Sequence, residues 1–376
     1  MKSKTQKMPW TFLLPFYGLT FLSLIRSAES AYPGQSRIEE KPMKAELIWS
    51  VGSDEKNEDF FKPSSFAVDG QGRVFILDSG NCRVQCFSPE GKFLFTFGRG
   101  GQGPGELTKE ADRIRILEDG NIYIIDNPQR RINVYNRDGK FLRLGKTSDE
   151  YDDVILIDGT YVTSNLIMIE GHIPIHVSKT LGSVDRSFGP FIDPDKDLLK
   201  RALQMKIPEI VHRAFSSKAS NLLVNSKKEI IFSPFSPYRL IKFDLKGNTL
   251  RDIEGQTSFY TGLPTILRID KKKDTIGIGL GGPFAKLTRP CLMEGDKLSY
   301  FYLNPENNTA FLDLFDPDLN LIARYKMANE IMDYRIEERR PKEHFGEVSI
   351  SRDNMLYALI FSQEDPPRLV KYKLIF

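Results

Sequence analysis

Short apolar runs separated by turns of glycine, aspartate and asparagine fill most of the chain. Residues 72–94, GRVFILDSGNCRVQCFSPEGKFL, hold two β-branched and aromatic runs around a polar loop, and the turn SPEGK follows the second run. Apolar runs bounded by Gly- and Asp-rich turns are typical of antiparallel strands joined in hairpins. The pattern therefore predicts an all-β chain of short strands.

The same pattern is repeated along the chain. Residues 120–142, GNIYIIDNPQRRINVYNRDGKFL, align without a gap on residues 72–94. Fainter copies lie at 154–189, 228–250, 296–322 and 354–374. Each copy reads as four strands, and six such units predict a six-bladed β-propeller of four-stranded antiparallel blades.

The last repeat lacks its fourth strand. It ends at Phe376 after three strands, whereas residues 45–53, AELIWSVGS, resemble the fourth strand KFLFTFGRG at 92–100. We therefore expect residues 45–53 to complete the C-terminal blade as its outermost strand, which would remove a free sheet edge. The predicted propeller domain spans residues 45–376.

The first 30 residues have the order of a secretory signal. Lys2, Lys4 and Lys7 precede an apolar run from Trp10 to Ile25, and small residues follow. The run is shorter than the ~20 residues of a spanning helix. We expect a signal peptide over 1–30, a linker over 31–44, and export to the periplasm or the cell exterior. An uncleaved segment that anchors the protein in the membrane is the alternative.

The charge of the chain argues against a nucleic-acid partner. The first 30 residues contain four basic residues and one acidic residue, which leaves 49 Lys and Arg against 49 Asp and Glu. A neutral protein without a long basic cluster is a poor nucleic-acid binder. Membrane contact is expected only if the N-terminal segment stays attached.

Three cysteines are an odd number for an exported chain. Cys82 and Cys86 on one strand would have Cα atoms ~13 Å apart, whereas a disulfide needs less than ~7 Å. Either Cys291 bridges one of them, or all three are reduced and buried. The second alternative is favoured because a free cysteine packs as a small hydrophobe.

Residues 78–107 carry a family resemblance. The pattern DSGN-x-RVQ-x-F-x-P-x-GK, followed by FG-x-x-G-x-GPGE, resembles the signature of NHL-repeat propellers. Cys82 stands where that family usually has histidine. The resemblance is strong over 60–145 and weaker elsewhere, and it implies a secreted bacterial six-bladed propeller. Members are more often binding platforms than enzymes, so the fold does not choose a function.

Two further motifs have structural explanations. The run Gly98-x-Gly100-x-x-Gly103 satisfies a dinucleotide-binding pattern, but a strand follows it and not the required helix. We predict that it links two blades.

A recurring arginine lies four residues before an aromatic position in the clear copies, and we expect it to tie each blade to a neighbour. Its copies are Arg83, Arg131, Arg239 and Arg368.

The long loops all fall on one face of the predicted propeller, because loops after the second and fourth strands leave a blade on the same side. They are residues 99–110, 190–215, 254–290 and 326–345, of which 194–206 and 328–340 have helical spacing. Loops on a rigid scaffold often carry function, so we predict a ligand-binding, loop-rich face. Its most exposed polar and aromatic candidates are Asn81, Arg99, Arg130, Arg201, His212, Tyr238, Arg340 and His344.

The sequence favours a binding or scaffolding module for a protein, a small molecule or a glycan. It contains no GxSxG, HExxH or CxxC motif, and we assign no catalytic residue and no cofactor. The alternative is a lactonase-like hydrolase or lyase with Ca²⁺ or Zn²⁺ at the central channel. Asp112, Asp152 and Asp153 begin predicted inner strands and are its candidate metal ligands, with salt bridges as their other role.

One histidine pair suggests a zinc site. His172 and His176 lie four residues apart in GHIPIH. On one extended strand they would be ~13 Å apart, too far to share an ion unless Pro174 bends the segment.

Overall fold

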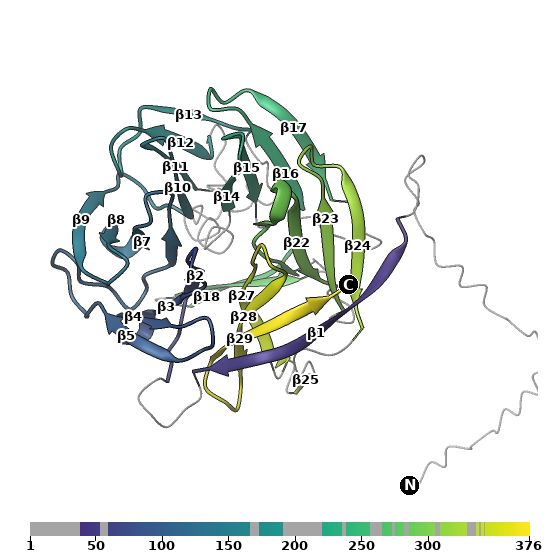
Figure 1. Cartoon of the computed structure of the whole chain (residues 1–376). Helices are drawn as coiled ribbons and strands as arrows, with labels where there is room; N and C mark the ends of the chain where they lie inside the picture. The colour runs from purple at the N-terminus through teal and green to yellow at the C-terminus, as the bar shows by residue number, and fades with distance from the viewer. Residues whose placement is uncertain are drawn as a thin grey trace, which may run out of the picture. The chain divides into compact units, whose positions relative to one another are not determined.

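The structure is a computed structural model of the chain. It describes residues 38–52, 59–165, 173–190, 220–234, 238–255, 265–272, 275–281, 286–304, 309–328, 336–337, 340–341 and 343–376. Within these residues the strands form a six-bladed β-propeller, with a four-stranded antiparallel arrangement in each blade (Figure 1). The all-β prediction and the predicted blade pattern are confirmed.

Blades 1 to 4 are separate sheets in which consecutive strands pair. Blade 1 contains β2 (Ser65–Val68), β3 (Val74–Asp78), β4 (Arg83–Phe87) and β5 (Phe93–Phe97). Blade 2 contains β6 (Arg113–Ile116), β7 (Ile122–Asp126), β8 (Arg131–Tyr135) and β9 (Phe141–Lys146). Blade 3 contains β10 (Asp153–Ile157), β11 (Thr160–Ser164), β12 (Ile175–Ser178) and β13 (Arg186–Phe188). Blade 4 contains β14 (Ser220–Val224), β15 (Ile230–Pro234), β16 (Arg239–Phe243) and β17 (Thr249–Glu254).

Blades 5 and 6 share one sheet. Blade 5 contains β20 (Lys286–Leu287), β21 (Cys291–Leu292), β22 (Leu298–Leu303), β23 (Ala310–Phe315) and β24 (Leu321–Met327). Blade 6 contains β27 (Glu343–Ile350), β28 (Met355–Ser362), β29 (Arg368–Ile375) and β1 (Glu40–Val51). Two hairpins lie outside the blades: β18 (Thr265–Lys272) with β19 (Thr275–Gly281), and β25 (Ile336–Glu337) with β26 (Arg340–Pro341).

The N-terminal strand closes the propeller as predicted. β1 pairs antiparallel with β29 from Lys44 opposite Ile375 to Val51 opposite Leu369. The strand begins at Glu40 and not at Ala45, because Glu40–Met43 also pair parallel with Arg324–Met327 of β24. One strand therefore joins the outer edges of two blades, and neither edge stays open.

Aromatic and cationic side chains fasten this closure to blade 1. The Trp49 indole nitrogen donates a hydrogen bond to the Pro89 carbonyl at 2.9 Å. The Lys371 ammonium donates to the same carbonyl at 3.1 Å and lies 5.9 Å from the Trp49 ring centroid and 5.4 Å from that of Tyr357. The contacts combine cation–π attraction with hydrogen bonding.

The hydrophobic core of the described residues is divided among the interfaces between adjacent blades. Phe75 and Val84 of blade 1 pack in one cluster with Ile124 of blade 2. The cluster between blades 6 and 1 contains Leu359, Phe66 and Val51 of β1, and corresponding clusters fill the other interfaces. Each blade therefore buries both faces, which explains its continuous apolar strands.

The recurring arginines Arg83 and Arg131 form ion pairs inside the fold. Arg131 forms an ion pair with Asp126 at 3.0 Å and donates to the Gly103 and Glu106 carbonyls at 3.0 and 2.7 Å. Arg83 pairs with Asp78 at 2.9 Å. Arg131 thus ties blade 2 to the link that follows blade 1, as predicted, whereas Arg83 pairs within blade 1 and Arg239 pairs within blade 4, with Asp252 at 2.6 Å.

The glycine run is a tight link between blades 1 and 2, as predicted. The Glu106 carboxylate accepts hydrogen bonds from Arg99 at 2.9 Å and from the Gly103 backbone at 2.8 Å. Gly105 has φ of 72°, and a Cβ added there would lie 2.8 Å from Phe141. A side chain would thus be both strained and crowded at this position.

Two smaller expectations have different outcomes. The three cysteines are buried and free, which supports the reduced alternative, and burial raises the pKa of the Cys86 thiol to about 11.

The prediction of a helix over 328–340 is wrong where that segment is described, because β25 and β26 pair as a hairpin there. Residues 194–206 lie outside the described residues. No helix among the described residues is long and apolar enough to span a membrane.

Removing the closing strand should destabilise the whole propeller. A chain beginning at residue 52 loses the buried side chains of Met43, Ala45 and Val51 and exposes the edges of β24 and β29. Compared with a chain beginning at residue 38, its melting temperature should fall by roughly 10 °C or more, at about 2–4 °C for each kcal/mol in a large domain. Equal melting temperatures in differential scanning calorimetry would show that β1 does not hold the ring.

Candidate functional site

The first strands of the blades lie beside one another around the centre of the propeller. β2 contacts β6 and β27, and β10 contacts β6 and β14, while β5, β9, β13 and β17 lie at the outside (Figure 1). Side chains that project from the first strands toward the axis therefore meet side chains from other blades. This geometry makes the start of the inner strands the place to search for a site.

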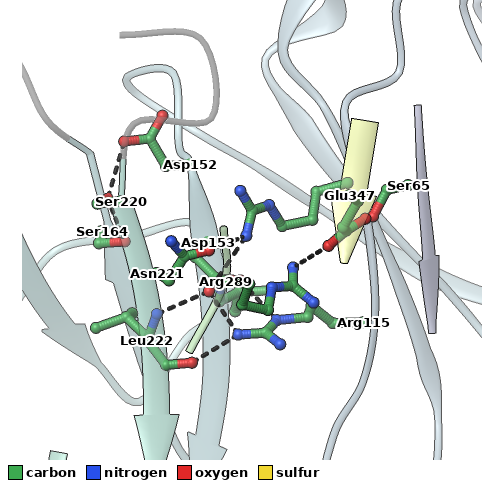
Figure 2. Close-up of polar contacts among 12 residues, drawn as sticks. Ser65, Arg115, Asp152, Asp153, Ser164, Ser220, Asn221, Leu222, Arg289 and Glu347 are labelled. Carbon is green, nitrogen blue, oxygen red and sulfur yellow. Dashed lines mark hydrogen bonds and ion pairs between the residues drawn. The ribbon is translucent and has the colours of Figure 1, made fainter. Parts of the chain in front are cut away.

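Five charged side chains from these strands come together, and we call them the axial charge cluster. They are Arg113 and Arg115 of β6, Asp153 of β10, Arg289 between β20 and β21, and Glu347 of β27. Figure 2 labels Arg115, Asp153, Arg289 and Glu347. Asp153 is fully buried, and Arg113 and Arg289 are 4% and 9% exposed. Charged groups are rarely buried this deeply unless they are paired.

Asp153 is the centre of the cluster. The Arg115 guanidinium donates to both of its oxygens, with Nε 2.7 Å from Oδ1, and Arg113 Nη1 lies 3.6 Å from Oδ2. The backbone amide of Leu222 donates to Oδ2 at 2.8 Å. One carboxylate thus holds together residues of blades 2, 3 and 4.

The neighbouring charges keep this carboxylate ionised. Burial by itself raises the pKa of Asp153, but Arg115 and Arg113 outweigh it and hold the pKa below its ordinary value. Burial lowers the pKa of Arg115 to about 10, which still leaves the guanidinium charged at neutral pH. The ion pair is therefore present at physiological pH.

The remaining members link the other blades. Glu347 Oε1 lies 3.0 Å from Arg289 Nη2, and its Oε2 accepts a hydrogen bond from the Phe66 amide of β2 at 3.1 Å. Arg113 also donates to the Asn221 side chain of β14 at 2.9 Å. Residues of all six blades thus take part in two polar groups that influence one another electrostatically and together contain three guanidinium groups and two carboxylates.

The three predicted metal ligands begin inner strands or directly precede them, as expected. Asp152 accepts a hydrogen bond from Ser220 at 2.9 Å, and Asp112 accepts one from Asn127 at 2.8 Å. Asp153 has the salt-bridge role described above. Among the described residues, no three His, Cys, Asp or Glu side chains lie close enough together to hold a metal ion. Metal binding by Asp112 and Asp152 stays a prediction.

Three predicted ligand-binding residues are exposed, but each contacts its own neighbourhood. Asn81 donates to Asp78 at 2.8 Å, and Arg130 lies 3.3 Å from the Ser148 carbonyl. Arg99 is 80% exposed at its side chain and pairs with Glu106. Ligand binding by these three side chains stays a prediction.

The expectation that Tyr238 is exposed is wrong. Its side chain is 1% exposed, packs edge-on against Tyr300 with ring centroids 4.6 Å apart, and donates to Asp313 at 2.9 Å. The aromatic ring fills the interface between blades 4 and 5, which a single-sequence reading of a loop could not reveal.

The other candidates are placed only in part. Arg340 lies in β26 and His344 in β27, so both belong to strands and not to the expected loop. Arg201, His212 and His172 lie outside the described residues. His176 has both ring nitrogens within hydrogen-bond distance of partners, at 2.8 Å from Asn165 and 2.8 Å from Ser187.

Sequence reasoning missed Arg113, Arg115, Arg289 and Glu347. A signal was present in RIRI (113–116), where two arginines alternate with isoleucine in a strand expected to be innermost. Alternation places both arginines on one face of the inner strand, and that face meets Asp153 of blade 3. Arg289 and Glu347 had no comparable signal because their partners are distant in sequence.

Comparison with known proteins supports the fold. Residues 64–163 match the family DUF5128, described as a 6-bladed beta-propeller. A DUF4221 family member from Bacteroides vulgatus is similar at a TM-score of 0.55 and 10% identity, covering 90% of this chain and 99% of that chain. A Bacteroides fragilis protein described as exported is similar at a TM-score of 0.51 and 11% identity, covering 91% and 98%.

An enzyme is also found among the similar structures. Virginiamycin B lyase from Staphylococcus aureus has a TM-score of 0.47 and 12% identity, covering 89% of this chain and 100% of that chain. No curated protein matches the sequence. Likeness at such identity extends to the fold and not to the activity.

Neutralising the central carboxylate should destabilise the protein strongly. Asp153→Asn leaves Arg113 and Arg115 without their counter-charge, and breaking a buried pair costs about 3–5 kcal/mol. Because the folded-state pKa of Asp153 is lowered, its contribution is complete above about pH 4 and is lost as pH falls through the lowered value. Urea unfolding should therefore show a large difference from the parent at pH 7 that narrows below about pH 4.

Asp252→Asn is the matched control for this substitution. The Asp252 carboxylate likewise accepts hydrogen bonds from Nε and Nη2 of an arginine, Arg239, but this pair is exposed to solvent. Its loss should cost about 1 kcal/mol or less. Equal effects of the two substitutions would contradict a central role for Asp153.

Proposed function

We propose that the chain is an exported binding module that takes up a ligand where the inner strands of the propeller begin. The observation that supports this is the composition of the axial charge cluster, with three guanidinium groups and two carboxylates. Asp153 and Arg113 are the first residues of β10 and β6. The loops between blades lead into the starts of these strands, which supports a ligand that binds near the predicted loop-rich face.

A divalent metal does not fit the residues of this cluster. Ca²⁺ takes six to eight oxygen ligands, yet both oxygens of Asp153 are engaged by Arg115, and Glu347 lies against Arg289. An added cation would also be repelled by the excess of guanidinium groups. The chemistry of the donor set favours a binding module over the metal-dependent hydrolase or lyase considered from the sequence.

The proposal includes export of the protein and an NHL type for its repeats. The signal-like order of residues 1–30 supports passage across the membrane, and a similar structure belongs to a protein described as exported. The repeats are proposed to be of the NHL type on the pattern in residues 78–107. The partner is proposed to be a small molecule, a glycan or a protein.

A thermal-shift screen of the purified chain tests this function. The screen compares Ca²⁺, Zn²⁺ and a chelator with a panel of small anionic, neutral and cationic molecules. We expect at least one anionic compound to raise the melting temperature in proportion to the logarithm of its concentration, as ligand linkage requires. The two metal ions should produce no such shift.

Measurements of bound metal and of lactone hydrolysis test the metal-dependent enzyme that is the alternative to a binding module. A stoichiometric divalent ion in the purified protein, together with metal-dependent hydrolysis of a lactone, would overturn the proposal. Binding of an anionic compound without turnover would support it.

A further inference from the structure

One edge of the Arg289 guanidinium carries two buried donors that make no hydrogen bond. Its Nε and Nη2 atoms are buried and make no hydrogen bond, although the residue is 9% exposed. Glu347 Oε1 lies 3.0 Å from Nη2 as an ion-pair contact, without the alignment of a hydrogen bond. Leaving buried charged donors unsatisfied is costly, so such an edge calls for an explanation.

The same edge binds a carboxylate elsewhere in this chain. Arg115 uses Nε and Nη2 to hold both oxygens of Asp153. Arg324 holds Asp313 in the same way, at 2.7 and 2.8 Å. The two parallel N–H groups match the spacing of the two oxygens of a planar carboxylate. The Nε and Nη2 edge of Arg289 is therefore chemically complementary to one carboxylate group.

The charge of the surroundings favours an anion at this position. The five residues of the cluster include one more guanidinium group than carboxylates, while Asp152, outside the cluster, also acts electrostatically on Arg113. Glu347 is the acid in contact with Arg289, and it is also held by the Phe66 amide. A buried excess of positive charge is stabilised by a counter-ion.

We propose that Arg289 binds the carboxylate group of a small organic anion on the propeller axis, with Nε and Nη2 donating to its two oxygens. This proposal rests on the proposed function and names the chemical class of its ligand. Arg113 and Arg115 contribute positive charge to the site, and Glu347 opposes binding because it competes for Nη2.

Formate and acetate are the simplest probes of this site. The melting temperature of the full chain is measured against formate, acetate and chloride at constant ionic strength, with the balance made up by a large sulfonate. Formate and acetate should raise it in a saturable manner and at much lower concentration than chloride, because their two oxygens give each of the two parallel N–H groups its own acceptor, whereas chloride is one shared acceptor. Absence of a saturable shift, or an equal shift with chloride, would overturn the proposal.

Two substitutions locate the effect. Arg289→Lys keeps the charge but loses the fork, and it should weaken the apparent formate affinity about tenfold or more. Glu347→Gln removes the competing carboxylate and should strengthen that affinity, which keeps the test valid if the lysine variant folds poorly. Arg239→Lys, at an exposed pair on β16, is the matched control and should leave the affinity unchanged.

The outcomes separate this site from the proposed function. If Arg289→Lys and Glu347→Gln both leave formate affinity at the parent value, the Arg289 site is wrong. In that case an anionic ligand found in the wider screen would still support a binding module. A stoichiometric metal with lactone hydrolysis would instead remove the proposed function, whatever the formate result.

Discussion

The buried ion pair of Asp153 with Arg115 is the constraint from which the centre of this propeller is built. A carboxylate that is removed from water must be compensated by nearby charge and hydrogen bonds, or the folded state loses several kcal/mol. Arg115, Arg113 and the Leu222 amide supply that compensation from blades 2 and 4. These blades must therefore take up one relative position around blade 3, and the position brings the remaining cluster residues together.

The outer edge of the propeller is held by a different interaction. β1 pairs with both β24 and β29, so the two ends of the repeated chain are joined by backbone hydrogen bonds. The hydrophobic clusters between blades are similar around the ring and do not by themselves define where it closes. Closure by β1 at the rim and the Arg289–Glu347 pair near the centre thus join the same two blades, 5 and 6.

The axial cluster also changes the functional interpretation of the chain. The carboxylates at the start of the inner strands suggested a metal, but the arginines that surround Asp153 were not anticipated. Once these arginines are in place, the centre favours a negative group over a cation. The unsatisfied edge of Arg289 then becomes the feature most in need of a partner.

Much of the fold could be predicted from the sequence because its causes are local and repeated. The alternation of apolar runs with glycine turns predicted the blades, and AELIWSVGS predicted the closing strand, since each signal lies within a few neighbouring residues. The site depended on tertiary structure. Arg113, Asp153, Arg289 and Glu347 come from four blades, and Tyr238 is buried by a neighbouring blade. Whether a charged side chain is paired, buried or left with free donors depends on partners far away in sequence, and only the folded ring brings them within reach.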